Sequence, residues 1–253
     1  MPLGPYYFNQ VAGPVGIGVN ESVLLSLNAY AKNNMVNTYC VANEFISAEI
    51  GRLLRLPIPP AGIMARTTPQ TQERWFATLN FNGRAGNLPP VPPRQTVARF
   101  PELSTGLLIF DILIANSDRH MGNLSVDLAG GRMDIFDHSH ALFGYMPGQG
   151  EARLDSIQGR LGISRGPVTQ GNRHCLLDAL QSDQHFDEWI ERVEKIPDYF
   201  IHGVCEDAID LGITTLEAVR AIQFLTERRD GMRELLRVHQ AAFTGIRQWR
   251  LFA

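Results

Sequence analysis

A stretch rich in glycine and proline divides this chain into two parts of different character. Residues 82–95 read NGRAGNLPPVPPRQ, a composition typical of a connecting segment. Before it, short runs of β-forming residues surround one segment whose apolar residues have helical spacing. After it, segments of helical length dominate. The sequence therefore predicts an α+β protein with two lobes: a β-rich N-lobe with one helix over residues 1–81, a linker over 82–95 and a larger, mainly helical C-lobe over 96–253.

The N-lobe is expected to hold strands on both sides of its helix. Residues 11–32 favour a strand, a turn and a second strand that ends at Lys32. Apolar residues recur at helical spacing over residues 37–56, and a cluster of prolines then ends the helix. Residues 58–66 and 74–81 predict two more strands.

The C-lobe is expected to begin with a buried helix over residues 102–115, ELSTGLLIFDILIA. Residues 123–139 then suit a hairpin in which AGGR forms the turn. The rest of the chain favours amphipathic helices. These are expected near residues 176–194, 198–211, 215–228 and 230–243.

The composition predicts a cytoplasmic protein that does not enter a membrane. No stretch approaches the roughly 18 uninterrupted apolar residues of a membrane span. The N-terminus lacks the basic start and apolar core of a signal peptide. The three cysteines are far apart, which is typical of buried thiols in a reducing compartment. A formal net charge of −3 argues against direct binding of nucleic acid.

The densest group of polar residues lies at the end of the most apolar segment. The run LLIFDILIA leads into NSDRHMGN, which contains Asp118 and Asn123. Asp137 lies at the far end of the expected hairpin, which would fold it back beside these two residues. Taken alone, Asp118 and Asn123 would equally suit a turn stabilised by Asx hydrogen bonds.

The three side chains have the chemistry that phosphoryl transfer requires. The Asp118 carboxylate could accept a proton from a hydroxyl group. The Asn123 side-chain oxygen and the Asp137 carboxylate are the hard oxygen ligands that Mg²⁺ prefers, and Mg²⁺ would bridge the phosphates of a nucleotide. The pattern Asp-x4-Asn, followed by an Asp on the next strand, is the layout of a kinase catalytic loop.

The other parts of a kinase site are expected upstream. The chain has only two lysines, and one of them, Lys32, ends a predicted strand where it could reach nucleotide phosphates. Glu44 on the following helix is its expected partner, with Glu49 as the alternative. Gly16 and Gly18 stand where a turn covering the phosphates would lie, although their spacing differs from the usual pattern.

The sequence resembles the HipA-like kinases, which are relatives of protein kinases and phosphatidylinositol kinases. The matching segments are NAYAK, NEFISAEIGRLLRLPIPP, FDILIANSDRHMGN and MDIFDHSHALFG, with a looser match at FLTERRDGMREL. The resemblance implies a bilobal kinase fold and an ATP- and Mg²⁺-dependent transfer of phosphate to Ser or Thr hydroxyls of a protein. It is also the sole basis for expecting a bacterial or phage setting and an antitoxin or other regulatory partner.

The resemblance also implies a role for each residue of the motifs. Asp118 would be the catalytic base. Lys32, with its partner Glu44, would bind phosphate, and Asn123 and Asp137 would be the Mg²⁺ ligands. His120 would brace the catalytic loop. Arg119 would stabilise the transferred phosphate or pair with Asp111 or Asp137.

Three alternative functions stay open on the sequence. A pseudokinase would bind nucleotide and act through a partner without phosphate transfer, and the atypical glycine turn leaves room for it. A kinase could also phosphorylate a small molecule or a lipid headgroup. A metal-dependent hydrolase would take its ligands from Asp118, His120, Asp137, His138 and His140.

Overall fold

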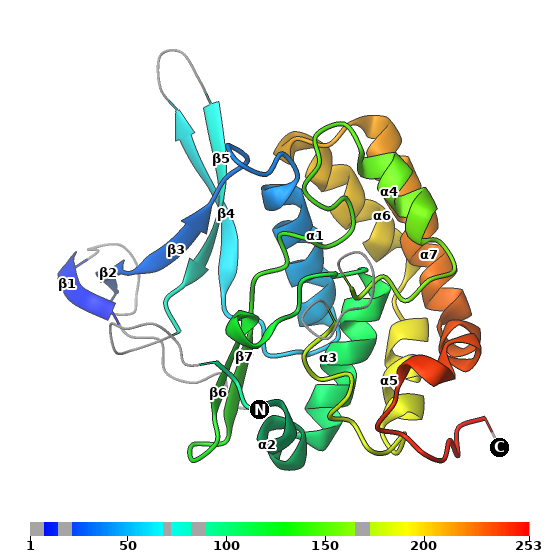
Figure 1. Ribbon diagram of the computed structural model, residues 1–253. Helices are drawn as coiled ribbons and strands as arrows, with labels where there is room; N and C mark the ends of the chain where they lie inside the picture. The colour runs from blue at the N-terminus through cyan, green and yellow to red at the C-terminus, as the bar shows by residue number, and fades with distance from the viewer. Residues whose placement is uncertain (1–7, 15–21, 68–71, 82–89, 165–172, 253) are drawn as a thin grey trace.

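The computed structural model describes residues 8–14, 22–67, 72–81, 90–164 and 173–252. Gly16 and Gly18, which were expected to cover nucleotide phosphates, lie outside the described residues, as does most of the predicted linker. Figure 1 shows a β-rich part of the chain beside a larger helical part.

The β-rich part contains two small antiparallel sheets among the described residues (Figure 1). In one, β1 (Phe8–Pro14) pairs with β2 (Val23–Leu27). In the other, the order is β3–β5–β4, formed by β3 (Ala29–Lys32), β4 (Ala61–Thr67) and β5 (Gln72–Leu79). The predicted strands are thus confirmed, and the apolar run before Lys32 forms two strands rather than one.

Helix α1 (Cys40–Leu53) joins the two parts. It contacts β4 and β5 on one side and α6 (Asp198–Asp207) on another. Asn34, two residues after the end of β3, accepts a hydrogen bond from the N–H of Val41 in the first turn of α1 at 2.9 Å. This bond satisfies a helix N–H that has no partner within the helix, and it fixes the short connection from Lys32 into α1.

The helical part is built around α3 (Pro101–Leu113), whose residues from Leu107 to Leu113 are fully buried. A helix that is apolar on all sides belongs in the centre of a protein, as the run LLIFDILIA predicted. The hairpin of β6 (Leu124–Asp127) and β7 (Arg132–Ile135) follows. The remaining helices are α2 (Pro93–Arg99), α4 (Gly150–Ile157), α5 (Phe186–Glu194) and α7 (Thr215–Val238), with 3-10 turns at Met121–Asn123 (η1), Ala208–Leu211 (η2) and Gln240–Ala242 (η3).

The C-terminal helices differ from the prediction in two respects. The two helices expected at residues 215–228 and 230–243 are one helix, α7, that continues through Gly231. An interior glycine costs about 1 kcal/mol relative to alanine, but Met232 and Leu236 beyond it are fully buried and favour continuation. The first ten residues of the helix expected at 176–194 form turns instead, and α5 begins at Phe186.

Among the described residues, no helix has both the length and the apolar character needed to cross a membrane.

The close packing of α3 against α5 provides a test of the fold. A Cβ atom at Gly106 would lie only 2.2 Å from Cε2 of the buried Trp189. We expect Gly106→Ala to lower the free energy of unfolding by about 2–3 kcal/mol, because Trp189 or a helix must shift to make room. Urea unfolding followed by circular dichroism would measure the change.

The matched control is Gly203→Ala on α6, where a Cβ atom would meet nothing within 4 Å. This substitution should leave stability unchanged or raise it by up to about 1 kcal/mol, because alanine is the better helix former. Equal losses in the two variants would contradict the packing of Trp189 on Gly106.

Candidate active site

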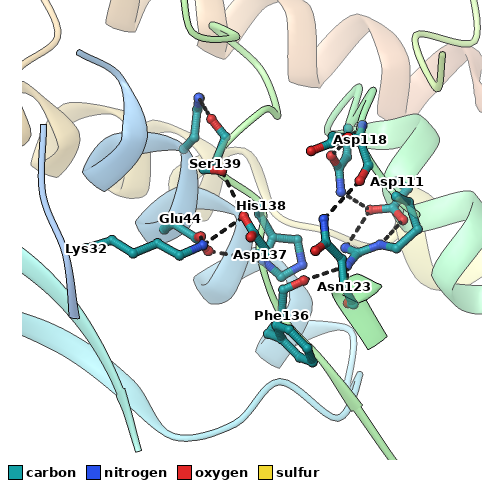
Figure 2. A network of polar contacts seen from close by, with 12 residues as sticks. Lys32, Glu44, Asp111, Asp118, Asn123, Phe136, Asp137, His138 and Ser139 are labelled. Carbon is teal, nitrogen blue, oxygen red and sulfur yellow. Dashed lines mark hydrogen bonds and ion pairs between the residues drawn. The ribbon is translucent and has the colours of Figure 1, made fainter. Parts of the chain in front are cut away.

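Lys32, Glu44 and Asp137 form an ion-pair cluster where the β-rich and helical parts meet (Figure 2). The Lys32 Nζ atom lies 2.6 Å from Glu44 Oε1 and 2.7 Å from Asp137 Oδ1. Lys32 ends β3, Glu44 lies in the first turns of α1, and Asp137 follows β7. Three residues that are far apart in the sequence are therefore brought together as predicted, with Glu44 rather than Glu49 as the partner of Lys32.

The charges of this cluster stabilise one another. Burial disfavours a charged Lys32, but Glu44 and Asp137 outweigh that effect and raise the pKa of the ammonium above its usual range. Burial likewise opposes ionisation of Glu44 and Asp137, yet Lys32 holds the pKa of both carboxyl groups below the usual range. All three side chains are therefore charged at neutral pH. Glu44 is only 2% exposed, so its charged form depends most on the ion pair with Lys32.

A second cluster contains Asp118 and Asn123, which lie to the right of the lysine cluster in Figure 2. The Asn123 amide group donates from Nδ2 to the Asp118 carbonyl oxygen at 2.9 Å. The Asp118 N–H in turn donates to the Asn116 side-chain oxygen at 3.2 Å. These bonds give the loop a defined shape. Because Asn123 uses its nitrogen within the loop, its side-chain oxygen is the atom suited to a metal ion.

Arg119 is buried beneath this loop. Its guanidinium group contacts Asp111 through Nε at 2.8 Å and Nη2 at 3.1 Å. Its Nη1 atom donates to the carbonyl oxygens of Asn123 at 2.7 Å and Phe136 at 2.6 Å. Of the two roles expected for Arg119, these contacts match the pairing with Asp111. Because Arg119 is only 1% exposed, it positions the loop from below.

Asp111 is the buried centre of a polar network. Besides Arg119, it accepts a hydrogen bond from Asn116 Nδ2 at 3.0 Å and lies 3.0 Å from Nε2 of His174. Burial opposes the charge of Asp111, but Arg119 and His174 hold its pKa well below the usual range. Burial lowers the pKa of His174. Asp111 was expected only as a possible partner of Arg119, and His174 was not predicted, because it is 63 residues from Asp111 in the sequence.

His120 has a smaller structural role. Its side chain is exposed, and its Nδ1 atom accepts a hydrogen bond from the N–H of Gly122 at 3.0 Å. This contact caps η1, the short 3-10 helix that ends at Asn123. The predicted brace of the loop thus acts through the backbone next to Asn123.

Asp137 lies in a constrained backbone segment. Its φ angle is +60°, a left-handed conformation that costs energy for residues other than glycine, although Asp tolerates it better than most. The Ser139 hydroxyl donates to Asp137 Oδ1 at 2.8 Å, and Asn43 Nδ2 donates to the Ser139 carbonyl oxygen at 2.9 Å. Asn43 precedes Glu44 on α1, so adjacent residues of one helix hold the Asp137 loop and Lys32.

Arg153 of α4 joins the two functional loops. It donates to the carbonyl oxygens of Ala115 at 3.0 Å and His140 at 3.2 Å, and also to that of Leu142. Ala115 and Leu142 both have positive φ angles, so Arg153 supports two strained positions at once. Burial lowers the pKa of the guanidinium group to about 10. No local sequence pattern marks Arg153, because α4 has a single fully buried apolar side chain, Leu154.

The residues of the site fit Mg²⁺ better than a transition metal. Asp137 and Asn123 offer one carboxylate and one amide oxygen, and Mg²⁺ is commonly held by few protein oxygens together with phosphates and water. No group of three or more His, Cys, Asp or Glu side chains in the described part of the chain is placed to hold a metal ion. The ligand set that a metal-dependent hydrolase would need is therefore not assembled among those residues.

The burial of Glu44 leads to a pH-dependent prediction. In Lys32→Met, the Glu44 carboxylate would lose its cation, so its pKa should rise above the ordinary value. At pH 7 we expect a loss of about 1–2 kcal/mol in unfolding free energy, a modest figure because Lys32 is partly exposed. The difference from wild type should shrink as the pH falls toward 5, since protonation of Glu44 then removes the unpaired charge.

Two further variants serve as controls for this experiment. Adding Glu44→Gln to Lys32→Met should restore part of the lost stability at pH 7 and reduce the pH dependence to the part that comes from Asp137, which also loses its contact with Lys32. Lys195→Met removes the other lysine, which is exposed and paired with Glu191 on the surface of α5, and should change stability by less than about 0.5 kcal/mol. If Lys32→Met lowered the free energy of unfolding equally at all pH values, the expected dependence of the Glu44 charge on Lys32 would be contradicted.

Comparison with known proteins bears on the fold. No protein-family model matches the chain, and no curated protein sequence does. Among solved structures, the Helicobacter pylori proinflammatory kinase CtkA is similar, with a TM-score of 0.50 and 14% sequence identity over 88% of this chain and 92% of that chain.

A second solved structure is similar at a lower level. It is the toxin–antitoxin complex of HipA, HipB and operator DNA from Shewanella oneidensis MR-1, with a TM-score of 0.33 and 11% identity over 94% of this chain and 62% of that chain. This likeness is too distant to support a conclusion, whereas the first extends over nearly the whole of both chains. The likeness to CtkA therefore shows that the chain has the α+β, bilobal kinase-like fold that its sequence predicts.

Proposed function

We propose that this protein is a phosphotransferase that uses ATP and Mg²⁺ to phosphorylate Ser or Thr hydroxyls of a protein. The observation that carries the proposal is the placement of Lys32 between Glu44 and Asp137, beside the loop of Asp118 and Asn123. The fold shared with a kinase supports it. Phosphoryl transfer requires mainly positioning and neutralisation of charge, and these residues supply both.

Each residue has a distinct task in this proposal. Lys32, kept protonated by its carboxylate neighbours, binds phosphate oxygens of ATP and stays oriented by Glu44. Asp118 accepts the proton of the acceptor hydroxyl while the hydroxyl oxygen bonds to the γ-phosphorus and the bond to ADP breaks. Asp137 and Asn123 would hold Mg²⁺, which supplies neutralisation of phosphate charge.

The protein environment of Asp118 is consistent with a base that meets its substrate at the surface. The Asp118 side chain is 18% exposed, and Nε2 of His140 lies 4.0 Å from its Oδ2 atom. Asp111, in contrast, is fully buried and fully engaged by Arg119 and its neighbours. Of the two carboxylates on this part of the chain, Asp118 is the one that an acceptor hydroxyl can reach.

The proposal is tested with γ-labelled ATP, Mg²⁺ and a generic protein acceptor such as casein or myelin basic protein. We expect label on protein with the wild type and a loss of about 10²–10⁴-fold in Asp118→Asn, because the proton acceptor is removed. Asp137→Asn should also abolish labelling, because it removes the carboxylate ligand. Asp210→Asn, an exposed carboxylate on η2, is the matched control and should label at the wild-type rate.

Thermal unfolding with ATP and Mg²⁺ separates the alternatives. A pseudokinase would be indicated if ATP and Mg²⁺ raised the melting temperature but no label appeared on protein, lipid headgroup or small-molecule acceptor. That result would contradict the proposal. Label on a small molecule or lipid alone would move the acceptor to that class. If ATP and Mg²⁺ produced no rise in melting temperature and no label on any acceptor, that result would contradict nucleotide binding itself.

A further inference from the structure

A large cavity lies away from the candidate active site. It is a groove of about 1100 Å³. Its walls are the segment from Arg55 to Pro60 after α1, the start of α3, strand β7 and helix α5. None of the residues assigned above to catalysis, phosphate binding or metal binding lines it.

The groove is basic in a chain that is acidic overall. It is lined by two carboxylates, Glu102 and Asp134, and by five arginines, and we call it the arginine groove. The arginines are Arg52, Arg55, Arg99, Arg132 and Arg192. The formal charge of these lining residues is therefore +3, whereas the net charge of the chain is −3. Such a concentration of one sign favours a ligand of the opposite sign.

The arginines of the groove differ in how far they are already neutralised. Arg132 makes two contacts with Asp134, at 2.8 and 2.9 Å, and Arg192 lies 3.2 Å from Glu102. Arg55 and Arg99 have no carboxylate within ion-pair distance in the part of the chain that is described. Arg99 donates only to the Leu128 carbonyl oxygen, at 3.3 Å. The positive charges of Arg55 and Arg99 are therefore available to a negatively charged ligand.

Apart from His185, the remaining lining of the groove is apolar. Its base is almost fully buried and is formed by Ile58, Phe100, Leu103, Met133 and Trp189. Pro57 and Pro60 are half-buried and Pro101 is exposed, so these prolines are the apolar surface that a ligand can reach. Arg192 also stacks over Trp189, with its guanidinium carbon 4.3 Å from the ring centre. A ligand that fits both features carries carboxylates and apolar side chains together.

The groove continues into a second, smaller cavity of about 350 Å³. The two cavities share Arg55 and Arg192, and the second one reaches Lys195. The basic surface is therefore a track rather than a closed pocket. An extended chain matches a track better than a compact small molecule does.

We propose that the arginine groove docks an acidic peptide segment of a partner protein, with its carboxylates on Arg55 and Arg99 and its apolar side chains against Pro57, Pro60 and Pro101. A nucleic acid would supply negative charge but no aliphatic side chains for the apolar lining. The groove also shares β7 with the active site, since Met133 and Asp134 line it and the same strand leads to Asp137. A partner held there stays next to the site without occupying it.

Binding is tested by fluorescence anisotropy with a short fluorescein-labelled peptide of alternating glutamate and leucine. The full-length protein is used without nucleotide, so the result is independent of phosphotransferase activity. We expect saturable binding that weakens with salt, and a loss of affinity of at least about tenfold in Arg55→Glu/Arg99→Glu, because both free cations are reversed. Arg55→Gln, at an exposed position, should weaken binding without disturbing the fold.

The matched control is Arg233→Glu/Arg237→Glu on α7, which makes the same change in net charge outside the groove. It should bind the peptide like the wild type. Equal losses in both double variants, or no binding to wild type, would overturn the proposal. So would tighter binding of a single-stranded DNA oligonucleotide of the same charge, or binding of an alternating lysine and leucine peptide with equal affinity.

Discussion

Asp111 carries a negative charge at a position with no exposed surface, at the end of the central helix α3. Such a charge is tolerated only because Arg119 meets it with two hydrogen bonds and Asn116 and His174 supply further contacts. The other end of the Arg119 guanidinium group holds the carbonyl oxygens of Asn123 and Phe136. One buried pair therefore fixes both the loop of Asp118 and the strand end that leads to Asp137. Removal of either partner would leave an unpaired buried charge and would release both loops.

Helix α1 connects this lower network to the β-rich part. Glu44 orients Lys32, and the preceding Asn43 donates to the Ser139 and Gly144 carbonyl oxygens and accepts from the N–H of Phe143. A shift of α1 would therefore move the lysine and the Asp137 loop together. The helix is buried between β4 and β5 and the helical part, which opposes such a shift. One helix therefore sets the positions of Lys32 and of the Asp137 loop, the groups proposed to bind phosphate and Mg²⁺.

Residue type and order allowed the sequence to predict Lys32, Glu44, Asp118, Asn123 and Asp137 as one group, and the ion pairs of Lys32 confirm that Lys32, Glu44 and Asp137 lie together. The supporting residues were not predictable in this way. Arg153 contacts Ala115 across 38 positions, and Asn43 contacts Phe143 across 100, so no local pattern marks either one. Helix α7 was expected as two helices with a break at residue 229, whereas burial of Met232 and Leu236 favours one continuous helix. Local spacing thus identified the candidate site residues, whereas long-range packing determines which other residues hold them in place.

The strong preference for arginine over lysine follows from the tasks that cations perform in this chain. A guanidinium group has five N–H donors in a fixed plane, so one arginine can satisfy several backbone carbonyls. Arg228 does this for Ile112, Ile157, Arg160 and Leu161, although burial lowers its pKa to about 9. The ammonium group of lysine is a compact point charge on a flexible stem, which suits Lys32 between two carboxylates. An arginine at position 32 would keep the charge but would place a wide planar group where Glu44 and Asp137 now approach one nitrogen to 2.6 and 2.7 Å. The use of a lysine at this position, in a chain that otherwise relies on arginine, therefore reflects the geometry of the site.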